Sequence, residues 1–277
     1  MKHLPHAGVW FPPSGETIRI GPGIFHLLSR IHLSIPSCLP KSCRYSKCFF
    51  HVYMVTSAER RRRFLLSCGI LASVFYVAMT LFVGLLWDGY SVVSGVPSEL
   101  SAIGAPTRLL WICLGAIYAV LMIAFGFMVW KSAPPNRAMR VVGALLMAHT
   151  VFGQFWPPMH QRAVLAAGGG TLTDTLHLVW AAITGVFFMF IVGFGAAALG
   201  KRFRVYSIAT MAIVLLCGAV TGTYASQVQA DLPTPGVGVW ERISIATFMA
   251  WIVVLATALL RAPHAAATPA RRSTLGP

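Results

Sequence analysis

Six long apolar runs after residue 63 restrict this chain more than any other feature. They cover Phe64–Trp87, Leu109–Trp130, Met139–Trp156, Thr175–Leu199, Val205–Ser226 and Ile243–Leu260. A helix needs about 20 apolar residues to cross a bilayer, and the third and sixth runs are near the short limit. The runs are continuous rather than alternating, which excludes the strands of a membrane barrel. The pattern therefore predicts an all-α polytopic membrane protein with six transmembrane helices.

The composition agrees with this fold class and excludes others. Hydrophobic residues make up 57% of the chain and charged residues only 10%, whereas soluble proteins contain about 25% charged residues. Such a chain is neither disordered nor a coiled coil nor a collagen-like fibre. We expect a multi-pass protein of the cell membrane, with membrane lipids as its partners.

Lys and Arg are distributed unequally along this pattern. Nineteen of the 22 precede the first run, follow the last run, or lie in the second and fourth connections. Only Arg108, Arg162 and Arg242 lie in the other connections. Because Lys and Arg favour the cytoplasmic side, we expect an up-down bundle with both termini in the cytoplasm. The positive charge then serves orientation and contact with anionic lipid, and no nucleic-acid partner is predicted.

The two ends of the chain differ from the apolar region. Residues 1–53 are rich in Pro, His, Cys and basic residues, and their longest apolar stretch is too short and too interrupted to cross a bilayer. We expect either an unstructured tail over 1–53 or a true start at Met54. The six-helix domain is predicted over 54–261, followed by a flexible cytoplasmic tail over 262–277.

Small residues spaced four apart indicate how the helices pack. Such pairs are Gly115 and Ala119, Gly193 and Ala197, and Gly218 and Gly222. In lipid, small residues let two helix backbones approach closely. We expect these faces to form helix contacts, and the same faces could pair two copies of the chain in a homo-oligomer.

Polar side chains gather in the connections on the predicted outer side. The three outer arginines lie there, and a polar residue that faces lipid is costly. We therefore expect a pocket at the outer mouth that binds a lipid headgroup or another small anion. Its predicted ligand-binding residues are Arg108, Arg162, Arg242, Glu241, Gln154, Tyr224 and Gln227.

A second hypothesis uses some of the same region for catalysis. His160, Asp174 and His177 have the donor types of a divalent metal site, and Glu99 could act as general base in a hydrolase of lipid esters or amides. The competing structural interpretation is that Asp174 stabilises a helix N-terminus. For Glu99, the competing structural interpretation is a loop carboxylate that pairs with Arg108.

A third hypothesis is a small transporter, for which His149 near the middle of the third run is the only deep histidine. No internal repeat supports it. The sequence identifies no cofactor, and it leaves open whether the protein is an enzyme.

Five short motifs carry a resemblance to a known family. They are Ser98-Glu-Leu-Ser101 with Pro106 and Arg108, Pro158-Met-His160-x-Arg162, Asp174-x-x-His177, Arg202-Phe-Arg-x-Tyr-Ser207 and Gly238-x-x-Glu241-Arg242. In this order, over about Phe64 to Arg261, the chain resembles bacterial and archaeal membrane proteins of domain-of-unknown-function family 998. The resemblance implies a small multi-pass membrane protein and no particular activity.

Overall fold

The computed structural model describes residues 45–132 and 136–262, with side chains from residue 57 onward. The chain divides into two units, Met1–Val52 and Tyr53–Pro277. Only the beginning of one helix is described in the first unit, so residues 1–44 of the predicted tail lie outside the described residues. Residues 263–277 of the predicted C-terminal tail lie outside them as well.

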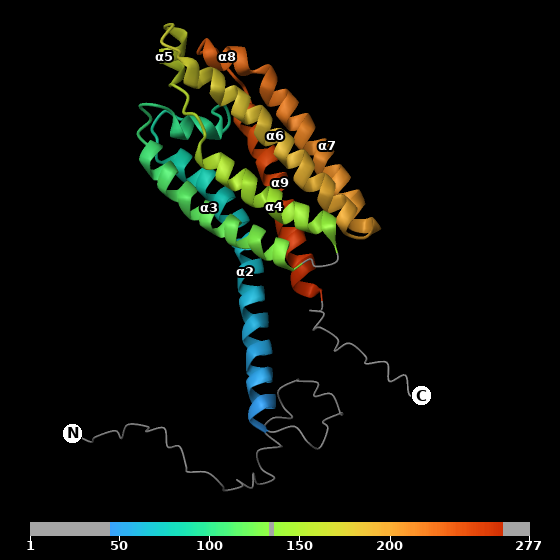
Figure 1. Ribbon diagram of the computed structural model, residues 1–277. Coiled ribbons are helices and arrows are strands. Elements are labelled where there is room, and N and C mark those ends of the chain that lie inside the picture. Colours follow the sequence, from blue (N-terminus) through green and yellow to red (C-terminus); the bar gives the residue numbers. More distant parts are fainter. Residues whose placement is uncertain (1–44, 133–135, 263–277) are drawn as a thin grey trace, which may run out of the picture. The chain divides into compact units, whose positions relative to one another are not determined.

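The described residues form an all-helical fold, as predicted (Figure 1). The elements are α2 (Tyr45–Leu85), the 3-10 helix η1 (Pro97–Ser101), α3 (Arg108–Lys131), α4 (Arg137–Gln154), α5 (Arg162–Ala166), α6 (Leu172–Ala198), α7 (Lys201–Thr223), α8 (Ala225–Gln229) and α9 (Val237–Arg261). Helix α2 begins at Tyr45, inside the segment predicted as a tail. Within the described ranges there is no strand, only an isolated bridge between Ile103 and His160.

Five helical segments are long and apolar enough to cross a membrane. They are Ser57–Leu85 of α2 and the whole of α3, α6, α7 and α9. The third apolar run forms α4, but this helix has only 18 residues and carries two arginines in its first turn. A multi-pass protein with several helices able to span is therefore confirmed, and five of the described helices meet this length and composition; the predicted sixth span, α4, stays a prediction.

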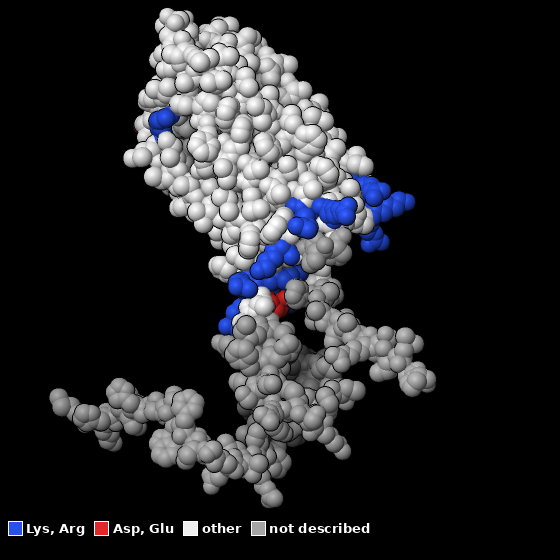
Figure 2. Space-filling model, viewed as in Figure 1, with Lys and Arg blue, Asp and Glu red and all other residues white. Residues whose placement is uncertain are grey.

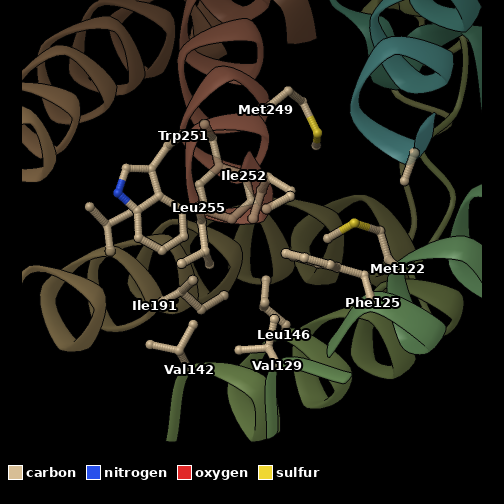
Figure 3. Packing of buried hydrophobic residues seen from close by; sticks show 14 of the residues in the cluster. Met122, Phe125, Val129, Val142, Leu146, Ile191, Met249, Trp251, Ile252 and Leu255 are labelled. Carbon is tan, nitrogen blue, oxygen red and sulfur yellow. The ribbon is translucent and has the colours of Figure 1, made fainter. Parts of the chain in front are cut away.

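Neighbouring helices pack along one another in a continuous series. Helix α3 packs on α4, α4 on α6, α6 on α7, and α7 on α9. Figure 3 shows Trp251, Ile252 and Leu255 of α9 directed towards residues of α4 and α6, with Phe125 of α3 beside them. All four side chains are fully buried. Because lipid is as apolar as these side chains, close packing stabilises the bundle more than removal from water does.

Glycines allow this close packing, but not the ones predicted. A methyl group on Gly143 of α4 would lie 2.7 Å from the carbonyl oxygen of Gly126 in α3. Gly195 of α6 lies against the Trp251 ring. By contrast, a methyl group on Gly115, Gly193, Gly218 or Gly222 would meet nothing within 4 Å. The prediction that these four glycines form helix contacts within the chain is therefore wrong, because they lie on open faces.

Polar bonds join helix ends where the basic residues gather (Figure 2). The buried Arg62 of α2 donates to the carbonyl of Leu259 at 2.6 Å, and this caps the last turn of α9. Asn136 caps the start of α4 and donates to the carbonyl of Ala198, at the end of α6, at 2.8 Å. Buried backbone carbonyls at helix ends need such partners, so these bonds fix α2 to α9 and α4 to α6.

We expect Gly143→Ala to lower the free energy of unfolding by about 1–3 kcal/mol, because the added methyl group meets backbone atoms that cannot move aside. The measurement is thermal or denaturant unfolding of the purified protein in detergent. Gly218→Ala is the matched control, since its methyl group meets nothing and gains helix propensity. Equal unfolding curves for the two variants would contradict this packing.

Candidate functional site

Three connecting segments, 86–107, 155–171 and 224–236, lie at the end of the bundle opposite the basic residues, and together we call them the cap. Glu99 of η1 is its most buried carboxylate, with a side chain 7% exposed. One carboxylate oxygen accepts the backbone N–H of Val96 at 3.0 Å, so the side chain closes the turn that Pro97 begins. The other oxygen faces the second segment of the cap.

Arg162 joins all three segments of the cap. Its Nε donates to Glu99, which forms a buried ion pair between the first and second segments. Its Nη1 donates to the Thr234 hydroxyl at 2.8 Å, and its Nη2 donates to the Ser94 carbonyl at 3.0 Å. Thr234 donates to the same carbonyl at 2.7 Å, which adds the third segment. The predicted pairing of Glu99 with Arg108 is wrong, because Arg162 occupies that carboxylate.

Arg242 of α9 anchors the first segment of the cap to the bundle. Its Nη1 donates to the carbonyl oxygens of Val92 at 2.6 Å and Gly95 at 2.9 Å, and its Nη2 donates to the Tyr90 hydroxyl at 2.8 Å. One turn earlier, Gly238 leaves no room for a side chain against this loop and donates to the Val93 carbonyl at 3.0 Å. Arg242 was expected to bind an anionic ligand, but its partners are backbone carbonyls and a phenol.

Tyr90 completes the enclosure of Arg242. Its hydroxyl lies 2.9 Å from the carbonyl oxygens of Gly95 and Val96, so it can donate to one of them while it accepts from Arg242. Burial raises the pKa of Tyr90 to about 12, although the Arg242 guanidinium acts in the opposite direction. The phenol therefore stays neutral at physiological pH and keeps the proton that it donates.

A second polar cluster lies where α6 begins. Asp174 accepts the backbone N–H of Thr171 at 2.8 Å and that of His160 at 2.7 Å. Its Oδ2 also lies 2.9 Å from Nδ1 of His160. The structural interpretation of Asp174 as a residue that stabilises the α6 N-terminus agrees with these bonds.

His177 turns away from this cluster. Its Nδ1 lies 2.8 Å from both Nε1 of Trp156 and the carbonyl oxygen of Pro157. Among the residues that the structure describes, no group of three His, Cys, Asp or Glu side chains is arranged to hold a metal ion. The structure brings His160 and Asp174 together, but His177 does not join them. The hydrolase reading of this trio stays a prediction from sequence.

The remaining predicted ligand residues do not converge with the two buried arginines. Gln154 is exposed and has one long bond of 3.5 Å, to Thr150 of its own helix. Gln227 is half-buried and accepts from its neighbour Ser226. Tyr224 is half-buried at the end of α7. Several predicted residues keep unused polar groups within the described part of the chain. Arg108 donates only to the Ser101 carbonyl, Nε of Arg242 is buried without a partner, and neither Tyr224 nor Glu241 forms a side-chain hydrogen bond.

Two residues of these contacts, Tyr90 and Thr234, are not indicated by any sequence pattern. Thr234 lies between Pro233 and Pro235 and resembles any loop threonine, although it is 2% exposed. Tyr90 follows Asp88 and Gly89 after an apolar run, a position typical of an aromatic residue at the membrane interface. Neither pattern indicates contact with an arginine that lies far away in sequence.

We expect Arg162→Ala to destabilise the protein by about 3–5 kcal/mol, because it leaves the Glu99 carboxylate buried without its partner. Unfolding in detergent measures the effect. Adding Glu99→Gln to Arg162→Ala should restore part of the loss, since the unpaired charge is then removed. Arg60→Ala, an exposed arginine at the opposite end, is the control and should behave as the wild type. A wild-type melting curve for Arg162→Ala would refute the role of this pair.

Comparison with known proteins identifies a family but no activity. No curated protein and no solved structure matches the chain. The matched region, residues 70–258, begins within α2 and ends within α9, and it includes the whole cap, with Glu99 and Arg162, and Arg242 of α9. Over this region the sequence matches the family described as protein of unknown function (DUF998), and the chain belongs to this family.

Proposed function

We propose that this protein of the cell membrane crosses the bilayer six times and binds a lipid phosphate or another small anion at its outer end through Arg108. In this arrangement the helices run up and down, both termini are cytoplasmic, and the cap is extracytoplasmic. The observation that carries the ligand proposal is the free hydrogen-bonding capacity of Arg108.

Helix α4 supports the sixth crossing. Its 18 residues correspond to about 27 Å at 1.5 Å per residue, close to the thickness of the hydrocarbon layer. It packs along α3 and α6, both of which are long enough to span. Its arginines lie in its first turn, where they can reach the membrane surface. A helix enclosed by two spanning helices needs less apolar surface of its own.

The distribution of charge supports the orientation. Lys131, Arg137, Lys201 and Arg204 lie at the ends where α3 meets α4 and α6 meets α7. Figure 2 shows Lys and Arg gathered at this end of the helical unit and little blue at the other. The cap contains one arginine, Arg162, and the first residues of α3 and α9 supply the other two on that side, Arg108 and Arg242. Positive residues near short connections favour the cytoplasm, so the cap faces outward.

Arg108 keeps more free N–H donors than the other two outer arginines. A guanidinium has five N–H donors, and within the described residues that of Arg108 donates only to the Ser101 carbonyl. Arg162 and Arg242 each bond to several cap groups, so we assign them to holding the cap and not to a ligand. The next residue along α3, Leu109, is 74% exposed.

This position suits a lipid phosphate. Leu109 and Ile112 provide an exposed apolar face below Arg108, as expected of a surface that contacts acyl chains. A guanidinium at the end of such a face lies at the depth of the headgroups, and its planar fork matches a phosphate. No observation favours the hydrolase or the transporter over this proposal, and both stay hypotheses from sequence.

Reporter fusions test the topology. A reporter after Gly168, in the cap, should be accessible from outside the cell, while reporters after Ser132 and Gly200 should be cytoplasmic. The reason is that α4 and α6 lie between Ser132 and Gly200. If both helices span, these two positions are on one side of the membrane and Gly168, between the helices, is on the other. If α4 does not span, the reporters after Ser132 and Gly168 will lie on the same side, and the six-span proposal is wrong.

Lipid retention tests the ligand. We expect Arg108→Ala to weaken binding of phosphatidylglycerol about tenfold or more, because a charge-assisted hydrogen bond contributes about 1.5–3 kcal/mol. Native mass spectrometry of protein from mixed phosphatidylglycerol and phosphatidylcholine nanodiscs measures the effect. Arg108→Lys should bind with intermediate strength, and Arg60→Ala is the charge-matched control at the other end. Unchanged retention by Arg108→Ala would disprove the assignment.

A further inference from the structure

At the end of the bundle opposite the cap, the start of α4 meets the connection between α6 and α7 (Figure 1). Nδ2 of Asn136, the residue before α4, donates to the carbonyl of Ala198 at 2.8 Å, and Ala198 is the last residue of α6. Helix α7 begins shortly afterwards, at Lys201. We call residues 136–140 and 198–204 together the α4–α7 junction. The hydrogen bond brings positive residues from two separate connections close to one another.

The basic residues of this junction fall into two groups. Arg204 belongs to the first, because its Nε donates to the carbonyl of Ala196 at 3.3 Å and so satisfies the end of α6. The second group contains Arg137, Lys201 and Arg202, which are all exposed. None of these three side chains forms an ion pair or a hydrogen bond with another residue that the structure describes. Their donors are therefore available to a partner outside the chain.

The two connections contain no acidic residue that could balance these charges. The sequence has none between Glu99 and Asp174, and none between Asp174 and Asp231. Glu59 of α2, at the same end of the bundle, already pairs with two arginines of its own helix. Positive groups close together repel one another, and an anion between them removes this cost. The charge of the junction therefore favours a negatively charged partner.

An exposed apolar face of α7 begins at these charges. Val205, Ile208 and Leu215 are each more than half exposed. They follow Lys201 at spacings of four, three and seven residues, which places all four on one face of the helix. In a bilayer such a face contacts acyl chains. Lys201 then lies where the acyl chains end and the headgroups begin, and its long side chain can reach a phosphate there.

We propose that the α4–α7 junction binds the phosphate of an anionic phospholipid, with Arg137, Lys201 and Arg202 as its positive groups. Guanidinium and ammonium groups both bind phosphate, and the exposed face of α7 accommodates an acyl chain. The lipid is anionic because a zwitterionic headgroup adds an ammonium or choline group, which these residues repel. The site is separate from that of Arg108, at the other end of the bundle. Only its assignment to the cytoplasmic leaflet rests on the orientation proposed above.

Retention of phosphatidylglycerol tests the proposal, with native mass spectrometry of protein released from nanodiscs of phosphatidylglycerol and phosphatidylcholine. We expect the double variant Lys201→Gln, Arg202→Gln to retain phosphatidylglycerol about tenfold or more weakly, because each basic residue near an anionic membrane contributes about fivefold. The matched control is Arg60→Gln, Arg61→Gln, which removes two exposed charges of α2 at the same end and should behave as the wild type. Melting curves show whether each variant is folded.

Two further variants separate a shared site from a local effect of charge. Arg137→Gln alone should weaken retention severalfold, although Arg137 lies on a different helix from Lys201 and Arg202. The exchange Lys201→Arg, Arg202→Lys keeps both charges and should retain the lipid within about threefold of the wild type. Glycerol 3-phosphate at the same concentration as the lipid should not displace it, since the soluble anion has no acyl chain to contact α7.

Several results would overturn the proposal. They are full retention by the double glutamine variant or by Arg137→Gln, loss of retention in the exchange variant, and an equal loss in the α2 control, which would indicate a response to net charge alone. Displacement by glycerol 3-phosphate would indicate a site for a soluble anion instead of a lipid.

The number of phosphatidylglycerol molecules retained separates this site from that of Arg108. Arg108→Ala should lose one bound lipid, the double variant Lys201→Gln, Arg202→Gln should lose a different one, and the combined variant should lose both. If only one of the two variants loses a lipid, the proposal for the other site fails alone.

Discussion

The bilayer offers no water to bond with buried polar groups, and this constraint explains the arrangement of charges in the protein. Every backbone carbonyl and every charged side chain near the hydrocarbon layer needs a partner from the protein itself. Helices meet this need along their length, so difficulty arises only at helix ends and connections. At one end Arg62 and Asn136 bond to the last carbonyls of α9 and α6. At the other end, Arg162 and Arg242 bond to the loops of the cap.

The cap uses its arginines as cross-links. Arg162 joins residues from all three connections, and Arg242 joins the first connection to α9. A guanidinium suits this task because its donors point in several directions within one plane, and it stays charged at any pH that the protein meets. The same bonds that make the cap coherent remove these two residues from ligand binding. Arg108 at the start of α3 keeps more of its donors, because it bonds only to the Ser101 carbonyl among the described residues.

Prediction of the candidate site from sequence was partly successful. The residue types and the end of the bundle at which they gather follow from the motifs, and Glu99 and Arg162 lie in a contact between two connections, as His160 and Asp174 do between a connection and α6. The pairing was wrong, since Glu99 bonds to Arg162 and not to Arg108. Two carboxylate–arginine pairings are equally compatible with the sequence, because the loop lengths permit both. Only the position of α5 relative to η1 selects between them.

The sequence by itself determined the all-α class, the positions of the apolar helices and the unequal distribution of charge, because these depend on local composition and on the cost of polar groups in lipid. Tertiary structure decided which small residues lie between helices. Gly126 and Gly143 lie against each other, and Gly195 lies against Trp251. Gly218 and Gly222 meet no neighbouring helix, although the spacing of these two glycines resembles a packing motif. It also decided that Glu99 pairs with Arg162 across two connections. Spacing defines a helix face, but which neighbour covers that face depends on how all the helices pack together.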